Sequence, residues 1–486
     1  MRRGLVGAAF ALVLLAGCGA GDPPPRTLSF HSRPDLTPPV VTVSTSSAAA
    51  APGYLFIAPK RGAIQKGPEI VDDRGRPVWF RPVPAQATDF RVQTYRGRKV
   101  LTWWQGPVDA PVPGTGAGHW VIMDEHYHQI ATVDGGFGPD TADLHELLLT
   151  PRGTAIVTAY RVVPHDLSRF GGPKNGTVAD SIVREIDVAT GRVLFTWHSL
   201  GHVALSESYA DIPQPKGGRP AAPYDYFHVN AVAEEPDGNL LVTARNTWAV
   251  YEIDRRTGKV LWRLGGKRSD FYMGPGTSFA WAHDARRAAD GTITIFDDEG
   301  SPDGADESRG LRIRLDLRRK TATFVQQDVA PDRVLASSQG NMQQLANGDV
   351  LVGWGAVPRI TEFDRSGKVV FDASFAPADD SYRAYRFEWT GLPTTRPSIA
   401  VDRSDGDVRD VYASWNGATD VKAWRVLAGL TAEHLRPVGR PVRRQGFETH
   451  VSVSTDAPFF AVQALGTGGK VLSTSAVIPV GGRAIG

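Results

Sequence analysis

One short pattern recurs six times in this chain and limits the folds available to it more than any other feature. Each copy has an apolar segment that ends in Asp, a turn with Gly or a polar residue, and a second apolar segment that often carries Trp. Apolar residues alternate or run on over four to six positions, which is the pattern of strands and not of helices. The aspartates recur at intervals of 48 to 67 residues and are Asp72, Asp124, Asp187, Asp254, Asp316 and Asp364.

A sixfold repeat of strand hairpins indicates an all-β chain whose sheets form a ring. We predict a six-bladed β-propeller over residues 53–393, and the high counts of Gly (52) and Pro (35) fit its many short strands and turns. After this region the repeat ends, and short alternating segments predict a small C-terminal β-sandwich of the fibronectin or Ig type over residues 398–480. Three tryptophans are expected to pack one blade against the next, namely Trp79, Trp197 and Trp262.

A histidine opens three copies of a second repeated element. In each copy the His precedes a short strand, a turn that ends in Gly and an apolar strand, and it keeps nearly the same register relative to that Gly. Because equivalent positions in a ring of repeats face the same axis, we expect His145, His228 and His283 to converge on a catalytic or metal site. Asp89 and Asn341 take the corresponding positions in two other repeats, so we expect an acid and an amide at the same channel mouth.

A positive charge close to these histidines in the sequence helps to decide whether they bind a metal cation or an anion. Three convergent histidines suggest zinc, but the sequence has no short His pair of the kind that pre-forms a metal site. Arg245 follows His228 by 17 residues, at the end of the next predicted strand, and its fixed positive charge disfavours a cation. This set suits a tetrahedral oxyanion such as sulfate or phosphate better. Two insertions rich in Gly and Pro, at residues 161–181 and 199–227, are predicted to be loops that shape the site.

The N-terminus predicts export and lipid attachment. Arg2 and Arg3 precede an apolar run too short to span a bilayer, and this run ends in Leu-Ala-Gly-Cys, which resembles a bacterial lipoprotein signal. Residues 1–18 are therefore expected to be a signal segment ending at Cys18, which would carry the lipid. The alternative is an ordinary secretory signal with an incidental Cys. Residues 19–52 are expected to be a flexible tether, so that the protein lies outside the cytoplasm, anchored to the outer face of the cell membrane.

Overall charge and cysteine content narrow the partners further. The formal net charge is only +2 and Arg and Asp are interspersed, so no basic patch argues for a nucleic-acid partner. Cys18 is the only cysteine, which excludes disulfides within the chain. The lipid on Cys18 would make the membrane a partner of this protein.

The phrases around the candidate residues resemble those of the arylsulfotransferase (ASST) family. In chain order they are DLHE at Asp143, DYFHVN at Asp225, DGNLLVTARNT at Asp237, GKVLWRLGG at Gly258, HDAR at His283, IFDDEG at Ile295, SRGLRIRLD at Ser308, NGDVLVGWG at Asn347 and SYRAYRFEW at Ser381. The resemblance implies a secreted propeller enzyme that moves a sulfuryl group from an aryl sulfate donor to a phenolic acceptor. It also implies a ping-pong reaction through a sulfohistidine, with no nucleotide sulfate donor, cofactor or metal.

Taken residue by residue, the resemblance makes His283 the nucleophile and gives His145, His228 and Arg245 the binding and stabilisation of the sulfuryl group. One of His145 and His228 would protonate the departing phenolate. Asp284 or a backbone carbonyl would fix the tautomer of His283, and Asp298 would help to brace its strand. Supporting or substrate-binding roles are expected for Asn230, Asp284, Asp297, Arg309, Asn341, Tyr226 and Trp281.

Two other functions remain open from the sequence. The alternative to the transferase is a non-catalytic propeller that binds an anionic or polymeric ligand of the cell envelope. A quinone-dependent dehydrogenase is suggested by the Gly-Lys-Val-Leu-Trp segments, but eight blades and calcium ligands are not apparent.

Overall fold

The computed structural model describes residues 27–61, 64–108, 110–136, 141–298, 307–377 and 379–486. In these ranges the regular elements are strands and three single-turn 3-10 helices, with no α-helix, so the all-β prediction is confirmed. The 3-10 helices are η1 (Ser168–Phe170), η2 (Leu205–Glu207) and η3 (Thr467–Gly469). None of the described helices is long and apolar enough to cross a membrane. The predicted signal segment and Cys18 lie outside the described residues.

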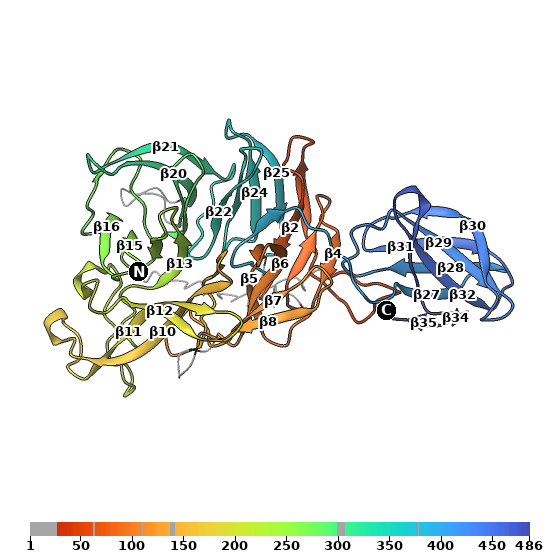
Figure 1. The fold of residues 1–486 in the computed structure, drawn as a ribbon, viewed down its shortest axis with the longest axis horizontal. Coiled ribbons are helices and arrows are strands. Elements are labelled where there is room, and N and C mark those ends of the chain that lie inside the picture. The colour runs from red at the N-terminus through yellow and green to blue at the C-terminus, as the bar shows by residue number, and fades with distance from the viewer. Residues whose placement is uncertain (1–26, 62–63, 109, 137–140, 299–306, 378) are drawn as a thin grey trace, which may run out of the picture.

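Six small sheets follow one another along the first four fifths of the described chain, as Figure 1 shows. The first contains β2 (Tyr54–Ile57), β3 (Glu69–Val71), β4 (Pro77–Phe80) and the distant β26 (Tyr385–Phe387). The second contains β5 (Gln86–Tyr95), β6 (Arg98–Gly106), β7 (His119–Met123) and β8 (Gln129–Val133). The third contains β9 (Leu147–Leu149), β10 (Thr154–His165), β11 (Gly176–Asp187) and β12 (Val193–His198).

The remaining three sheets of this region have the same design. The fourth contains β13 (Val229–Glu234), β14 (Leu240–Ala244), β15 (Ala249–Ile253) and β16 (Val260–Gly265). The fifth contains β18 (His283–Arg287), β19 (Ile293–Asp297), β20 (Arg309–Asp316), β21 (Thr321–Val329) and the short parallel β17 (Tyr272–Met273). The sixth contains β22 (Asn341–Gln344), β23 (Val350–Gly353), β24 (Arg359–Phe363), β25 (Val369–Ser374) and β1 (Thr42–Ser46).

The repeated aspartates lie at one equivalent place in all six sheets, the turn between the third and fourth strands of the sheet order. Their carboxylates accept backbone N–H groups of the same turn. For Asp364, these bonds come from Ser366 at 2.8 Å and Lys368 at 3.1 Å. Such a turn depends on four or five adjacent residues, which is why the sequence alone revealed it.

Buried apolar side chains join each sheet to the next. Separate hydrophobic clusters connect the first sheet to the second, the second to the third, and so on to the sixth. A further cluster joins the sixth sheet to the first, through Leu351 and Phe371 packed with Leu55 and Val71. The tryptophans expected between sheets lie in these clusters, namely Trp79, Trp197 and Trp262.

Strand pairing also connects the two ends of this region. β26 pairs antiparallel with β2, and β1 pairs antiparallel with β25. Residues 42–46 therefore form an edge strand, although they belong to the segment expected to be a flexible tether. The reason is local, because the alternating Thr, Val and Ser side chains suit an edge strand and Val43 packs on the cluster between the sixth and first sheets.

The two insertions fold differently from each other. The first, expected to be a loop, instead lengthens β10 and β11 at its two ends, and these strands pair without interruption from Thr154 with Asp187 to His165 with Gly176. Only residues 166–175 between the strands, which include η1, are a loop. Its alternating exposed and half-buried residues have the period of a strand, which the Gly and Pro content obscured. The second contains η2, isolated bridges at Lys216, Arg219 and Tyr224, and otherwise irregular chain, so it is largely a loop.

Residues after β26 form two more sheets that stand to one side of the other six in Figure 1. One contains β27 (Ser398–Arg403), β28 (Val408–Ser414), β31 (Glu448–Ser454) and β35 (Arg483–Ala484). The other contains β29 (Ala423–Gly429), β30 (Arg436–Arg443), β32 (Phe459–Leu465), β33 (Val471–Thr474) and β34 (Ile478–Pro479). They share one buried cluster, and the Asn416 amide ties them to the first sheet by two bonds to the Phe80 backbone, at 2.9 and 3.0 Å.

Candidate active site

One cavity collects the residues that the repeats were expected to bring together. It has a volume of about 670 Å³ and is lined by His145, His228, His283, Arg245 and Trp281. The three histidines stand just before or at the start of the first strands of the third, fourth and fifth sheets. Their common register along the repeats therefore brings them close together in space. The rings of His145 and His228 are 4.9 Å apart, centroid to centroid, and lie edge to face.

The second insertion supplies much of the remaining wall. Ala210, Pro213, Ala222 and Pro223 line the cavity together with Asp211. Apolar side chains from other segments face it as well, and these are Val108, Pro113 and Leu144. The cavity thus combines a polar end with a wall that an aromatic ring can contact.

Every histidine of the cavity gives one ring nitrogen to a carboxylate. The Nδ1 pairs are His145 with Asp143 at 2.5 Å, His283 with Asp298 at 2.6 Å, and His228 with Asp225. A carboxylate accepts, so each of these bonds places the ring proton on Nδ1 and leaves the lone pair on Nε2. The rings are therefore oriented and share one tautomer, which makes Nε2 the atom available for chemistry.

His283 has the properties of a neutral nucleophile. Burial, the guanidinium of Arg245 and the neighbouring His145 and His228 hold its pKa well below the ordinary value. Its Nε2 accepts a hydrogen bond from the backbone N–H of Gln339 at 3.2 Å, as an unprotonated nitrogen does. Since the imidazole nucleophile must be unprotonated, both observations favour attack from this atom.

His145 is kept neutral by the same cause. Burial lowers its pKa, and the Asp143 carboxylate opposes that shift only in part.

Backbone strain is concentrated around the cavity, since His228 has φ +56°, Trp281 has φ +55° and Gln339 has φ +72°. Non-glycine residues adopt this left-handed conformation at an energetic cost, and such residues cluster at functional sites.

Arg245 supplies a fixed positive charge to the cavity. Its Nη1 donates to the Asn246 side chain and its Nη2 to the carbonyl of Ser337, both at 3.1 Å. The guanidinium lies over the Trp281 ring, 4.5 Å from the centroid, so the tryptophan holds it by a cation–π contact. These bonds use two of its five N–H donors, and the others can serve an anion.

A buried ion network links several sheets, and two of its members, Glu146 and Asp284, directly follow His145 and His283 in the chain. It contains three arginines and three carboxylates, so its formal charges balance, and its members are Arg91, Arg286, Arg383, Asp89, Glu146 and Asp284. The arginines hold the pKa of Glu146 well below its ordinary value, although burial opposes them. The network accounts for Asp89 and Asp284, which neutralise arginines and do not line the cavity.

Three other predicted site residues do not line the cavity. Two of them hold the backbone of neighbouring segments, and the third lies in the core. Asn230 donates to the Ala282 carbonyl at 2.8 Å, which fixes the residue just before His283. Asn341 bonds both amide ends to the Ala384 backbone, at 2.8 and 2.9 Å, and so joins β22 to the segment before β26. Tyr226 is fully buried in the core between the third and fourth sheets and does not face the cavity.

Asp297 and Arg309 pair with each other within the fifth sheet. Arg309 Nε donates to Asp297 Oδ2 at 3.0 Å, and the other Asp297 oxygen accepts the Ala280 N–H at 3.0 Å. The tautomer of His283 is fixed by Asp298, so the expectation that Asp284 or a backbone carbonyl would do so is wrong. Asp298 follows β19 and lies two residues after Phe296, the partner of His283 in the β18–β19 pairing, whereas Asp284 turns toward Arg286.

Sequence reasoning missed several residues that line the cavity or hold its histidines. Asp143 and Asp225 stand two and three residues before their histidines, so a search for Asp just ahead of each repeated His would have found them. Lys60, Gln339 and Tyr382 also line the cavity, but no repeat or spacing signals them. They come from segments between strands, far from the histidines in sequence.

The donor set favours an anion over a metal ion. In the part of the chain that the structure describes, no group of three or more His, Cys, Asp or Glu residues is arranged to hold a metal. The three Nε2 atoms share their cavity with the Arg245 guanidinium, whose charge would repel a cation and attract an oxyanion.

Comparisons with known proteins agree with the resemblance seen in the sequence. The family model described as arylsulfotransferase (ASST) matches residues 91–376, more than half of the chain. No curated protein matches this chain.

Solved structures give weaker likenesses. A Bacteroides caccae protein of unknown function is 14% identical, with a TM-score of 0.42, over 69% of this chain and 100% of that one. A streptogramin B lyase is 11% identical, with a TM-score of 0.36, over 77% and 94% of the two chains. A Staphylococcus aureus virginiamycin B lyase is 11% identical, with a TM-score of 0.28, over 77% and 96%. Likenesses at these TM-scores say nothing about activity.

Proposed function

The chain belongs to the arylsulfotransferase (ASST) family, and we propose that it moves a sulfuryl group from an aryl sulfate to a phenolic acceptor through a sulfohistidine at His283. One observation carries the proposal: a neutral histidine, with its Nδ1 on a carboxylate and its Nε2 unprotonated, shares a cavity with an arginine and two further histidines. This is the set that attack on a tetrahedral, anionic sulfur requires.

The first half-reaction transfers the sulfuryl group to the protein. The Nε2 lone pair of His283 forms a bond to sulfur, the bond from sulfur to the aryl oxygen breaks, and its electron pair leaves with the phenolate. The phenolate takes a proton from the imidazolium form of His228, because burial keeps His145 neutral. Asp298 accepts the Nδ1–H of His283 and stabilises the positive charge that develops on the ring.

The second half-reaction reverses these movements with another phenol. The acceptor gives its proton to Nε2 of the histidine that acted as the acid, its oxygen bonds to sulfur, and the electron pair of the N–S bond returns to His283. Arg245 donates hydrogen bonds to the sulfuryl oxygens in both halves, and donors placed in this way contribute several kcal/mol, ~3 for one well-placed donor. The proton balance closes without a further reactant.

The cavity wall fits the aryl part of both substrates. Trp281 and the apolar side chains of the second insertion lie beside the histidines, so a phenyl ring can contact them while its oxygen points toward the polar end. Contact of a ring with an aromatic side chain contributes about 0.5–1.5 kcal/mol beyond the burial of its area.

We further propose that the six sheets form a six-bladed propeller and that Cys18 anchors it to the outer face of the cell membrane. The cluster that joins the sixth sheet to the first supports the ring. The Leu-Ala-Gly-Cys pattern supports the anchor. Replacing Cys18 with Ser should release the protein from the membrane fraction, and a variant that stays membrane-bound and lipid-labelled would contradict the anchor.

Phenol release from a chromogenic aryl sulfate, with and without a second phenol, tests the transfer. We expect release that depends on the acceptor and disappears in His283→Ala. The matched control is His198→Ala, because His198 has the same pairing of Nδ1 with a carboxylate, Asp180 at 2.6 Å, but does not line the cavity. Full transfer by His283→Ala would refute the nucleophile. Release that ignores the acceptor would indicate a hydrolase, and no release would favour the non-catalytic binding propeller.

A further inference from the structure

A lysine outside the family-matched residues reaches the cavity of His283. The match covers residues 91–376, so it carries no information about Lys60 or its partner Asp380. Lys60 is 6% exposed and lines the cavity. Its ammonium donates to the side-chain carbonyl of Gln339 and lies 3.1 Å from Asp380 Oδ1. A lysine is seldom buried unless its charge is paired and its donors are used, and both conditions are met here.

Gln339 connects this lysine to the nucleophile. Its backbone N–H donates to Nε2 of His283 at 3.2 Å, while Ser337, two residues earlier, accepts from Nη2 of Arg245 at 3.1 Å. One three-residue segment therefore contacts both the attacking atom and the arginine that would bind the sulfuryl group. The relative position of these two groups depends on how this segment is held.

The segment is held in a conformation that a free chain would avoid. Gln339 has φ +72°, and the chain on either side constrains it. The N–H of Gly340 donates to the Tyr382 carbonyl at 2.9 Å, and a Cβ on Gly355 would lie 2.5 Å from the carbonyl carbon of Gln339. The Gln339 side chain is fixed at both amide atoms, by Lys60 and by Asp380 Oδ2 at 3.4 Å. Strain that is maintained in this way at a cavity points to a role in the site.

We propose that Lys60 is a positioning residue for the nucleophile: by holding Gln339, it keeps the Gln339 N–H on Nε2 of His283. The covalent N–H bond of Gln339 stays intact throughout the reaction. In the substrate-free protein, the hydrogen bond from this N–H fixes the direction of the Nε2 lone pair of His283. An amide donor does so without protonating the ring.

The second part of this role rests on the proposed function. When the Nε2 lone pair forms the bond to sulfur and the aryl oxygen leaves with its electron pair, the Gln339 N–H loses its acceptor. The sulfuryl oxygens then lie next to it, so it donates to one of them and stabilises the sulfohistidine. Arg245 and Gln339 would thus bind different oxygens of the same group.

The experiment compares Lys60→Met, which keeps the aliphatic stem but removes the ammonium, with Gln339→Gly, which keeps the N–H and permits the left-handed backbone. In both, we expect the nitrogen NMR resonance of His283 Nε2 to shift in the substrate-free protein. We also expect kcat for transfer to fall by about 10- to 100-fold, with a smaller change in KM for the donor. His283→Gln assigns the resonance by its loss.

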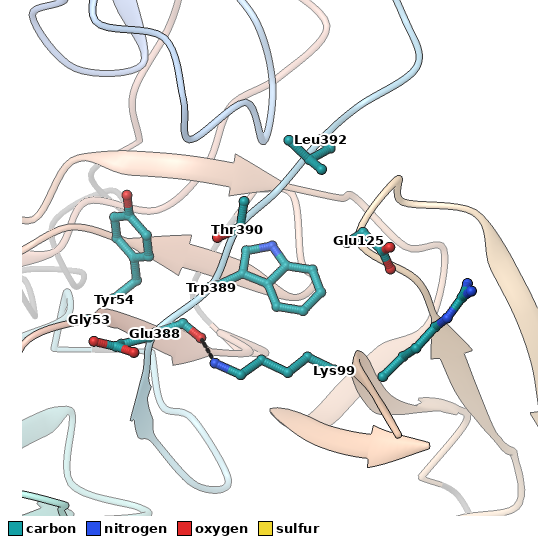
Figure 2. Close-up of a pocket in the computed structure, with 9 residues that line it drawn as sticks. Gly53, Tyr54, Lys99, Glu125, Glu388, Trp389, Thr390 and Leu392 are labelled. Carbon is teal, nitrogen blue, oxygen red and sulfur yellow. Dashed lines mark hydrogen bonds between the residues drawn. The ribbon is translucent and has the colours of Figure 1, made fainter. Parts of the chain in front are cut away.

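The matched control is Lys99→Met. Lys99 also donates a hydrogen bond, to the Glu388 carbonyl at 3.2 Å, but it lies in a separate surface pocket beside Trp389 (Figure 2). This variant should leave the Nε2 resonance and kcat unchanged. A lysine that only stabilised the fold would lower the unfolding temperature without moving the Nε2 resonance.

The two readouts separate the inference from the proposed function. An unshifted Nε2 resonance in folded Lys60→Met would overturn the inference, even if His283→Ala abolishes transfer. If the two variants shift the Nε2 resonance but the wild-type protein transfers no sulfuryl group, the positioning role is supported and the proposed reaction is contradicted. If Lys60→Met does not fold, Gln339→Gly decides the question alone.

Discussion

At the scale of single residues, the two ring nitrogens of each cavity histidine have different roles. Nδ1 is held by an aspartate and Nε2 is left for the reaction, and this division repeats in three sheets. The repeat explains why the tautomer is the same in all three rings. It also makes the role of each aspartate testable without removing the histidine.

We predict that Asp298→Asn lowers sulfuryl transfer by at least ~100-fold. The amide lacks the negative charge that, in the proposed reaction, stabilises the sulfated ring, and its NH₂ group can donate to Nδ1, which moves the ring proton onto Nε2. Asp180→Asn is the control, because it alters an equally short His–Asp pair outside the cavity and should transfer at nearly the wild-type rate. Equal rates for the two variants in the aryl sulfate assay would contradict the assignment of Asp298.

The site was partly predictable at this scale. Register along the repeats identified His145, His228 and His283, because equivalent positions of equivalent sheets face the same place. The partner of His283 was not predictable, because Asp298 and Asp284 are both nearby in sequence and only the β18–β19 pairing decides between them. Tyr226 was assigned to the substrate because aromatic residues near a site are numerous, yet its ring faces the core.

At the scale of elements, buried charged side chains connect strands that are not paired by backbone hydrogen bonds. Arg383, just before β26, contacts Asp89 of β5 at 3.1 Å, Glu146 before β9 at 3.3 Å and Asp284 of β18 at 3.6 Å. These carboxylates come from three different sheets. A single guanidinium therefore ties the segment that completes the first sheet to the second, third and fifth.

We predict that Arg383→Met destabilises the protein by about 3–5 kcal/mol, because it leaves buried carboxylates without their counter-charge. The control is Arg314→Met, which breaks an exposed pair with Asp290 and should cost about 0–1 kcal/mol. Urea unfolding followed by tryptophan fluorescence measures both. If the two variants unfold at the same urea concentration, the network does not stabilise the fold.

At the scale of the whole molecule, two histidines that burial keeps neutral make stability depend on pH. The pKa of His283 and that of His145 lie below their ordinary values in the folded protein. The unfolded chain therefore binds more protons than the folded chain as pH falls below about 6.5, and the stabilising contribution that is complete above this pH is lost below it.

We predict that the free energy of unfolding decreases as pH falls from about 7 to 5, by up to ~1.4 kcal/mol per pH unit for each of these histidines. In the variant that carries both His145→Gln and His283→Gln, this part of the slope should disappear. Unfolding curves at a series of pH values measure the slope. A slope in the double variant as steep as that of the wild type would show that other groups cause the acid sensitivity.

What the sequence determined by itself was local or periodic. Asp turns, strand alternation and the common register of three histidines each depend on a few adjacent residues or on a repeat, so they predicted the all-β fold, its sheets and the convergent rings. Tertiary structure alone decided which carboxylate holds His283, how β1 and β26 complete distant sheets, and that Lys60 reaches His283 through Gln339. These contacts join residues that are far apart in the chain, or choose between equivalent neighbours, and both depend on how the sheets pack in three dimensions.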